Sequence, residues 1–145
     1  MDVFTIGFTK KSAEQFFGIL KKNGIKRLVD VRLNNVSQLA GFTKREDLQF
    51  FLEEICGADY VHEPLLAPTQ EMLDTYKKAK GDWKEYEKEF LRLITARKIE
   101  DRIDQSLFSV PAVLLCSEPT AEHCHRRLVV EYLQGKWTDV RIKHL

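Results

Sequence analysis

Hydrophobic residues recur at helical spacing in several stretches of the chain. A first helix is predicted after Ser12, where Gln15 is placed to complete a capping box, and Gly24 marks its end. Thr43 and Glu46 predict a second capping box before another apolar helical face. The first part of the chain therefore contains two helices with recognisable starts.

The second half of the chain continues this helical pattern. A short helix is predicted after Thr69, and a long helical stretch over 82–108 shifts its apolar face, which predicts a break near 96–98. A last helix is predicted from Thr120 or nearby through Leu133.

Short apolar runs lie between these helices and predict strands. The run at 110–116, VPAVLLC, has the continuous apolar character of a central parallel strand that is buried on both faces. Strands are predicted at 3–8, 25–32, 58–62, 110–116 and 140–145. Strands separated by helices predict an α/β fold with a mostly parallel central sheet flanked by helices, a Rossmann-like three-layer arrangement in a single domain over 1–145.

The composition agrees with one ordinary globular domain of 145 residues and argues against several special classes. The 23 basic and 22 acidic residues nearly balance, so the charge by itself does not indicate nucleic acid. No apolar run approaches the roughly 20 residues that span a bilayer, and the start MDVFTIGF lacks the basic segment of a signal peptide. We therefore expect a cytoplasmic protein without membrane contact, whose three cysteines are reduced.

Polar residues follow three of the predicted strands. In parallel α/β folds, ligands bind beyond the carboxyl ends of the strands. That rule brings the segments 7–9, 30–34 and 116–126 to one hypothetical site.

Cys116 stands at the end of the predicted central strand, just before a predicted helix. Backbone N–H groups and the helix dipole at such a position favour a thiolate, although cysteines more often simply pack in the core. Glu118 follows as a candidate acid or base, or as a residue that only favours the helix start.

The run from His123 to Arg126 falls in the first turns of the predicted helix. Consecutive helical residues point in different directions, so at most two of these side chains are expected in one pocket. Cys124 is expected to face inward, His125 is a candidate catalytic residue, and Arg126 could bind a carboxylate, a phosphate or Asp30.

These cysteines and histidines are also of the residue types that bind zinc. The segment has no CxxC, and adjacent Cys and His on one helix do not easily converge on a tetrahedral ion. The sequence therefore predicts no metal and no cofactor.

Asp30 and Arg32 alternate on one face of the second predicted strand. Either they form a buried ion pair that fixes the architecture, or Arg32 binds an anion at the sheet edge. We favour anion binding for Arg32 and a structural role for Asp30.

Four short motifs resemble a known family, the domain-of-unknown-function family four-eight-eight. They are TIGFT at 5–9, LVDVR at 28–32, LLCSE at 114–118 and CHRR at 124–127. The resemblance spans nearly the whole chain and implies a compact α/β domain with these motifs on one side. It implies these candidate pocket residues: Thr9, Asp30, Arg32, Cys116, Glu118, Cys124, His125 and Arg126.

The chain departs from the family pattern at two places. Phe8 stands where the family often has histidine, which leaves open whether an activity is lost, and PLLAP at 64–68 lacks the family's glycine pair.

Three functions are compatible with these residues. The first is an enzyme acting on a small anionic or nucleotide-like ligand, with Cys116 as nucleophile and Glu118 or His125 as acid or base. The second is a nucleic-acid or nucleotide binding module without catalysis, for which no RNP, GXXG or helix-turn-helix signature is present. The third is a buried polar network that only fixes the fold. The oligomeric state is left open by the sequence.

Overall fold

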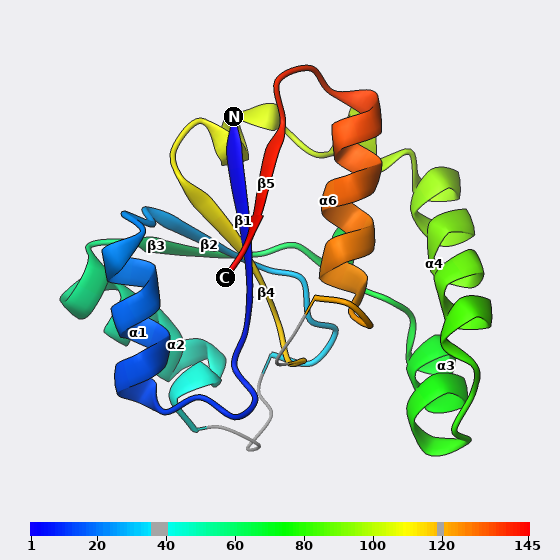
Figure 1. Ribbon diagram of the computed structural model, residues 1–145, viewed down its shortest axis with the longest axis horizontal. Coiled ribbons are helices and arrows are strands. Elements are labelled where there is room, and N and C mark those ends of the chain that lie inside the picture. The colour runs from blue at the N-terminus through cyan, green and yellow to red at the C-terminus, as the bar shows by residue number, and fades with distance from the viewer. Residues whose placement is uncertain (36–40, 119–120) are drawn as a thin grey trace.

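The computed structural model describes residues 1–35, 41–118 and 121–145. Five parallel strands form one sheet in the order β3-β2-β4-β1-β5 (Figure 1). The strands are β1 (Asp2–Gly7), β2 (Arg27–Asp30), β3 (Asp59–His62), β4 (Ala112–Cys116) and β5 (Arg141–His144). The predicted α/β fold with a parallel sheet is confirmed, and so is the central position of the run at 110–116, because β4 is the middle strand and is buried along its length.

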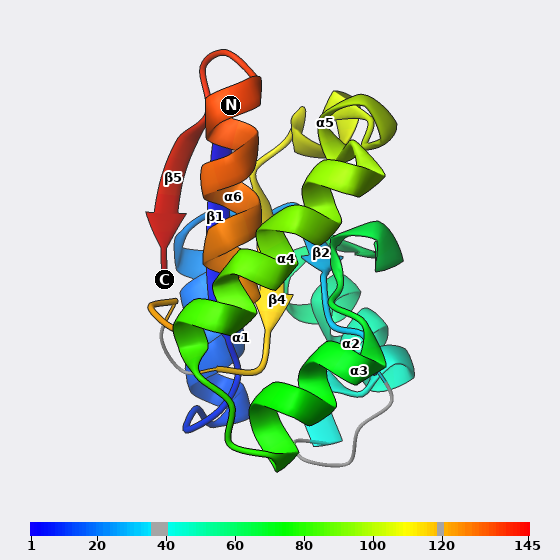
Figure 2. The same cartoon turned by 90° about the vertical axis from the view of Figure 1, so that its right-hand side faces the viewer.

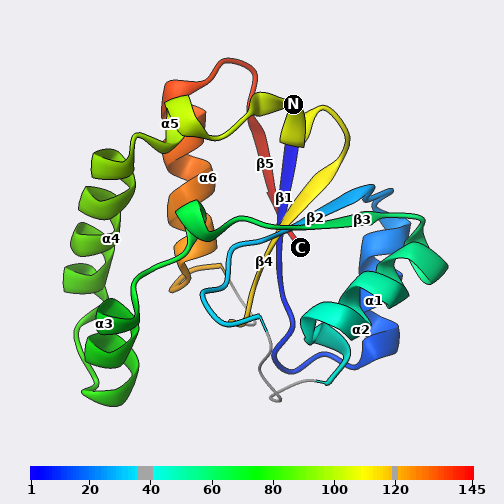
Figure 3. The same cartoon turned by 180° about the vertical axis from the view of Figure 1, so that it is seen from behind.

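Helices cover both faces of the sheet, as the three-layer prediction requires. The helices are α1 (Ala13–Lys22), α2 (Arg45–Phe51), α3 (Gln70–Leu73), α4 (Trp83–Arg97), α5 (Ile99–Arg102) and α6 (His125–Lys136). Figure 1 and the view from behind in Figure 3 both place α1 and α2 on one side of the sheet and α3, α4 and α6 on the other. Figure 2 shows α4 and α6 next to each other over the sheet.

Two apolar cores lie between these layers. Phe16, Leu20 and Leu28 belong to the core under α1 and α2. Phe90 and Val129 belong to the core under α4 and α6. Successive side chains of a strand point to opposite faces, so the buried strand β4 contributes to both cores, with Leu114 in one and Leu115 in the other. This two-sided burial explains the unbroken apolar run of its sequence.

The first predicted cap is confirmed and the second is wrong. Ser12 and Gln15 exchange the two hydrogen bonds of a capping box at the start of α1. At α2 the N-cap is Lys44, with no side-chain hydrogen bond to the helix. Thr43 is instead buried in a 3-10 turn, and its carbonyl accepts a hydrogen bond from Arg32 Nη2 at 2.7 Å. A tertiary contact therefore overrides the local capping pattern.

The long helical stretch breaks where its sequence predicts. Helix α4 ends at Arg97, and Lys98 takes a left-handed backbone conformation with φ 52° before α5 begins. The short helix after Thr69 is also confirmed, because the Thr69 side chain accepts a hydrogen bond from Met72 N.

The predicted start of the last helix is wrong. Thr120 lies outside the described residues, and α6 begins only at His125, with Cys124 as an extended N-cap at φ −138° and ψ 140°. Cys124 N instead donates to Ala121 O at 3.3 Å and closes a turn ahead of the helix. This late start changes where the side chains of Cys124 and His125 point.

Candidate functional site

The carboxyl ends of three strands lie next to one another, as the sheet rule predicts. Gly7 of β1 pairs with Cys116 of β4, and Asp30 of β2 pairs with Leu115. A Cβ on Gly7 would lie 1.5 Å from the carbonyl oxygen of Glu118, so only glycine lets the chain after β4 cross the end of β1. The register therefore brings the three predicted segments to one edge of the sheet.

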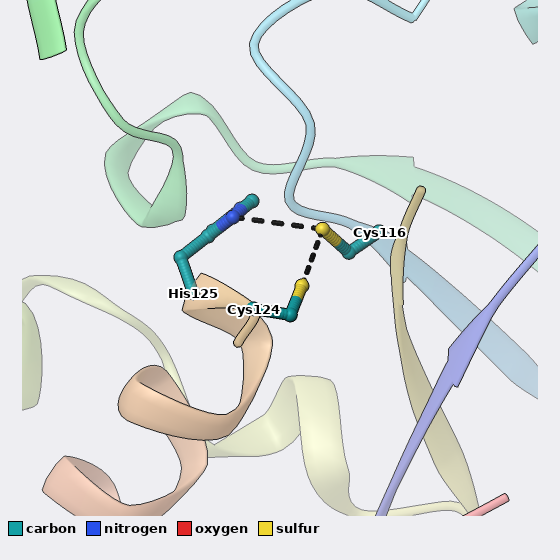
Figure 4. Close-up of side chains that lie close together, drawn as sticks. All are labelled: Cys116, Cys124 and His125. Atoms are coloured by element: carbon teal, nitrogen blue, oxygen red, sulfur yellow. Dashed lines mark hydrogen bonds between the residues drawn. The ribbon is translucent and has the colours of Figure 1, made fainter. Parts of the chain in front are cut away.

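Cys116, Cys124 and His125 form a buried sulfur–imidazole cluster at this edge (Figure 4). Cys116 Sγ lies 2.6 Å from Cys124 Sγ and 3.5 Å from His125 Nδ1. Both cysteines are free thiols. The cluster joins the end of β4 to the start of α6.

The convergence of Cys124 and His125 contradicts the expectation that an adjacent Cys and His on this helix do not easily converge on one point. That expectation assumed a helix that already includes both residues. Cys124 is extended and His125 is the first helical residue, so the change of backbone conformation between them turns both side chains toward Cys116. The ligand atoms of the three residues lie within 4.8 Å of one another. Among the described residues, these three form the group that could hold a metal ion. The set of two sulfurs and one ring nitrogen is of the kind that zinc accepts.

The ring of His125 is oriented by the backbone of a neighbouring strand. His125 Nε2 lies 2.7 Å from the carbonyl oxygen of Val31. A carbonyl can only accept, so we assign the proton to Nε2. Nδ1 then faces Cys116 and can take the thiol proton.

The surroundings of the cluster favour a thiolate on Cys116. Burial alone raises the pKa of Cys116, but the Cys124 hydrogen bond and the positive charges of His125 and Arg126 outweigh it, and the pKa falls well below the usual value. Burial and the neighbouring sulfur raise the pKa of Cys124. Burial lowers the pKa of His125, but the Cys116 anion more than offsets this and the pKa rises. The two shifts favour a thiolate–imidazolium pair, with Cys124 as the protonated neighbour.

A cavity of about 290 Å³ opens onto Cys116 and His125. This volume is at the lower end of the range for small-molecule sites. The described residues that line it are Phe8, Arg32, Leu33, Asn34, Pro68, Gln70, Leu73, Asp74, Lys77, Cys116, Ser117 and His125. A smaller cavity of about 40 Å³ adjoins it, where Cys116, Cys124 and His125 meet the aromatic rings of Tyr76, Trp83 and Tyr86.

Asp30 and Arg32 form a buried bidentate ion pair beside the cavity. Arg32 Nε and Nη2 donate to the two oxygens of Asp30 at 2.8 and 2.7 Å, and the side chains are 6% and 0% exposed. Tyr60 also donates to Asp30, at 2.7 Å. Arg32 thus has the contacts of the structural alternative, and among the described residues only its Nη1 lacks a partner. Arg32 still lines the cavity, so anion binding by Arg32 stays a prediction.

The remaining candidates lie around the cluster. Glu118 forms an ion pair with Lys77 at the edge of the smaller cavity. Arg126 is fully buried and donates from Nη1 to the Glu118 carbonyl at 2.8 Å, while its Nε and Nη2 have no partner among the described residues. Thr9 lies outside the cavity lining, where its N–H donates to Ser117 O at 3.0 Å. Arg126 therefore acts on the cluster through its charge, and Thr9 through the backbone of the loop.

Lys77 is a residue of the site that the sequence patterns do not predict. This residue lies in a π-helical turn, η4 (Asp74–Lys78), and lines both cavities. The sequence around it, KKAKGDWKEYEKE, has the charge pattern of a solvated helix face, so nothing local distinguishes Lys77 from its neighbours. Only the packing of this turn near β4 brings it to the site.

Comparison with known proteins gives one match. The family described as a domain of unknown function, DUF488, matches residues 12–133. The chain belongs to this family. The matched range covers the LVDVR, LLCSE and CHRR segments and confirms the resemblance noted from the sequence, while the TIGFT segment lies before it. No curated protein and no solved structure matches the chain.

The family description states no activity, so the chemistry must be argued from the residues themselves. In the part of the chain that the structure describes, no helix is both long and apolar enough to cross a membrane.

Proposed function

We propose that this DUF488 protein is an enzyme that uses Cys116 as a nucleophile on a small anionic ligand. The observation that carries the proposal is the position of Cys116 Sγ at the cavity, 3.5 Å from a histidine nitrogen that is oriented by a backbone carbonyl. A nucleophile beside a base that is itself held by a third group is the arrangement shared by cysteine-dependent enzymes.

The reaction class is acyl substitution through a covalent thioester intermediate. The Cys116 thiolate attacks the electrophilic centre and forms a bond to sulfur, and the bond to the leaving group breaks. The His125 imidazolium gives its Nδ1 proton to that leaving group. His125 can then take a proton from water, whose oxygen displaces the thiolate and restores the starting state.

The charges around the cavity favour an anionic ligand. Arg32, Lys77 and His125 line it, and Asp74 is the acidic residue among the described lining. Lys77 also forms an ion pair with Glu118, and of the two cavities Glu118 lines only the smaller one. An anion in the larger cavity would lie near Lys77, Arg32 and His125, which are the basic residues among its described lining.

Alkylation of the native protein, followed by mass spectrometry of each cysteine, tests the proposal. We expect Cys116 to react first, with an apparent pKa below about 8.5, and phosphate or adenosine monophosphate to slow the reaction. Protection by both points to a phosphate-sized ligand, and protection by the nucleotide alone points to a nucleotide. If Cys116 reacts only after unfolding, or neither anion protects it, the proposal is wrong.

A comparison of iodoacetate with iodoacetamide isolates the effect of charge. We expect Lys77→Gln to lower the iodoacetate-to-iodoacetamide rate ratio at Cys116 by about 1.5- to 5-fold, which corresponds to about 0.2–1 kcal/mol for a half-exposed charge. Lys84→Gln is the matched control, because Lys84 is exposed on α4 and lies outside the lining of both cavities. Equal ratios in the two variants would remove Lys77 from the anion site.

A further inference from the structure

The two sulfur atoms of the cluster are close enough to react with each other. They lie 2.6 Å apart as free thiols, whereas a disulfide bond measures about 2.05 Å. We propose that Cys116 and Cys124 are a redox-active dithiol, which hydroperoxides oxidise to a disulfide that reversibly removes the nucleophile. This inference rests on the proposed function, because the site it regulates is the same one.

The two cysteines differ in their access to small molecules. Cys116 lines both cavities, whereas Cys124 lines only the smaller one. A peroxide entering from the larger cavity therefore meets Cys116 first. Cys124 lies behind it in direct contact, which is the position of a resolving thiol.

The charges at the cluster separate the same two roles. His125 and Arg126 place positive charge near Cys116 and lower its pKa, so Cys116 is the thiolate that attacks. Burial and the adjacent Cys116 raise the pKa of Cys124, which keeps its proton until the second step. A single attacking thiolate with a protonated neighbour is suited to a two-step oxidation.

The reaction balances with hydrogen peroxide as the oxidant. The Cys116 thiolate attacks one peroxide oxygen, the O–O bond breaks, and with one proton taken up the products are a sulfenic acid and water. The Cys124 sulfur then attacks the sulfenic sulfur, an S–S bond forms, the S–O bond breaks, and the hydroxyl leaves with the thiol proton as a second water. Two thiols are oxidised, one peroxide is reduced, and a small dithiol such as dithiothreitol reverses the change.

Local structure allows this bond without a large rearrangement. Cys124 is the extended N-cap of α6, where its N–H donates to Ala121 O in the preceding turn and its carbonyl accepts from Arg127 N, and its side chain already points at Cys116 Sγ. Once Sγ of Cys116 is bonded to Cys124, it can no longer act as a nucleophile toward a ligand in the cavity. Oxidation would thus inactivate the site while the sheet and α6 stay intact.

Cys56 provides an internal control. It lies in the other core, under α1 and α2, and its thiol donates weakly to Phe17 O at 3.8 Å. Burial raises its pKa, so it should resist peroxide.

The test is a titration of the native chain with hydrogen peroxide, followed by peptide mapping without reduction. We expect a Cys116–Cys124 crosslink, unmodified Cys56, and recovery of Cys116 alkylation after dithiothreitol. Cys56→Ser should behave as the native chain. Cys124→Ser should stop at a sulfenic acid that dimedone captures, and Cys116→Ser should form no crosslink.

The outcomes separate this inference from the proposed function. If Cys116 is readily alkylated but peroxide gives no crosslink, or drives Cys116 to sulfinic acid although Cys124 is present, the dithiol is overturned and the nucleophile stands. If Cys116 forms the crosslink but no anion protects it from alkylation, the dithiol stands and the proposed function falls. If the purified protein carries one zinc ion per chain that blocks both thiols, the cluster is a metal site and the dithiol is overturned.

Discussion

Two buried polar clusters lie at the same edge of the sheet and differ in how their charges are satisfied. At the end of β2, Asp30 accepts from Arg32 and Tyr60, and each of its oxygens has a partner. At the end of β4, the sulfur–imidazole cluster has no carboxylate within its hydrogen bonds, and the fully buried Arg126 leaves two nitrogens without a described partner. In the first cluster Asp30 balances the charge of Arg32, although Arg32 Nη1 also lacks a described partner, whereas no described carboxylate forms a hydrogen bond with Arg126. Burial of polar groups therefore does not by itself indicate a reactive site, and the difference in counter-ions is the feature that agrees with the role proposed for Cys116.

Removing Asp30 should break the Asp30–Arg32 ion pair and cause the largest loss of folding stability. Asp30→Ala leaves the Arg32 guanidinium buried without its counter-ion, so we expect a loss of about 3–5 kcal/mol in the free energy of unfolding, measured in urea. The matched control is Asp59→Ala, which breaks the exposed Arg27–Asp59 pair and should cost at most about 1 kcal/mol.

A second variant tests the same cluster in a chain that keeps its fold. The double variant Asp30→Leu with Arg32→Met replaces the pair by apolar groups and should recover most of the stability. Cys116 should keep its alkylation rate there toward the neutral reagent, because its hydrogen bonds go to Cys124 and His125. A Cys116 that becomes unreactive in the folded double variant would show that the two clusters act as one.

Gly7→Ala should disturb the segment that follows β4 and leads from Cys116 toward α6. The added methyl would overlap the Glu118 carbonyl, and we expect a loss of about 1–3 kcal/mol in the free energy of unfolding. Gly18→Ala is the control, because a Cβ there meets no atom within 4 Å, and alanine in a helix interior should stabilise by about 0.5–1 kcal/mol. Equal effects at the two glycines would mean that the loop moves freely away from β1.

His125→Gln sharpens the comparison at the reactive cluster. Loss of the imidazolium should raise the apparent pKa of Cys116 and slow its alkylation at pH 7, about tenfold for each unit of pKa. His123→Gln, in the turn just before α6, is the control and should leave the rate unchanged, because the hydrogen bonds of Cys116 go to Cys124 and His125. If His125→Gln leaves the alkylation profile unaltered, the histidine does not activate the thiol.

Cys116 and His125 should also affect how the free energy of unfolding depends on pH. The raised His125 pKa contributes stability below about pH 6.5 that is lost as pH rises through the folded value. The lowered Cys116 pKa contributes stability above about pH 8.5 that is lost as pH falls through the folded value. Between these limits the folded and unfolded pairs hold the same number of protons, so the contribution is flat. The difference in unfolding free energy between the native chain and the Cys116→Ser, His125→Gln double variant should therefore fall on both sides of this window.

Local sequence patterns predicted much of the fold because their causes are local. The capping box at Ser12 needs only residues three apart, and the buried strand ending at Cys116 is recognised by its unbroken apolar run. The cap predicted at Thr43 is wrong because Thr43 ends a buried 3-10 turn, which Arg32 contacts at the Thr43 carbonyl, and the N-cap of α2 is the next residue, Lys44.

The site was predicted in part for the same reason. The rule for parallel sheets correctly gathers the ends of β1, β2 and β4 at one edge. It does not give the orientation of side chains after β4, which depends on the late start of α6 at His125. Lys77 escaped prediction because its turn reaches the cavity only through tertiary packing.

The sequence by itself determined the α/β class, the central strand and the family, because periodicity, caps and short motifs depend only on residues that are close in the sequence. The tertiary structure alone decided that Cys116 contacts both Cys124 and His125, that Arg32 is held by Asp30, and that Lys77 faces the cavity. The physical reason is that reactivity depends on distances of a few ångströms and on burial between residues far apart in the chain, and no spacing along the sequence fixes either quantity.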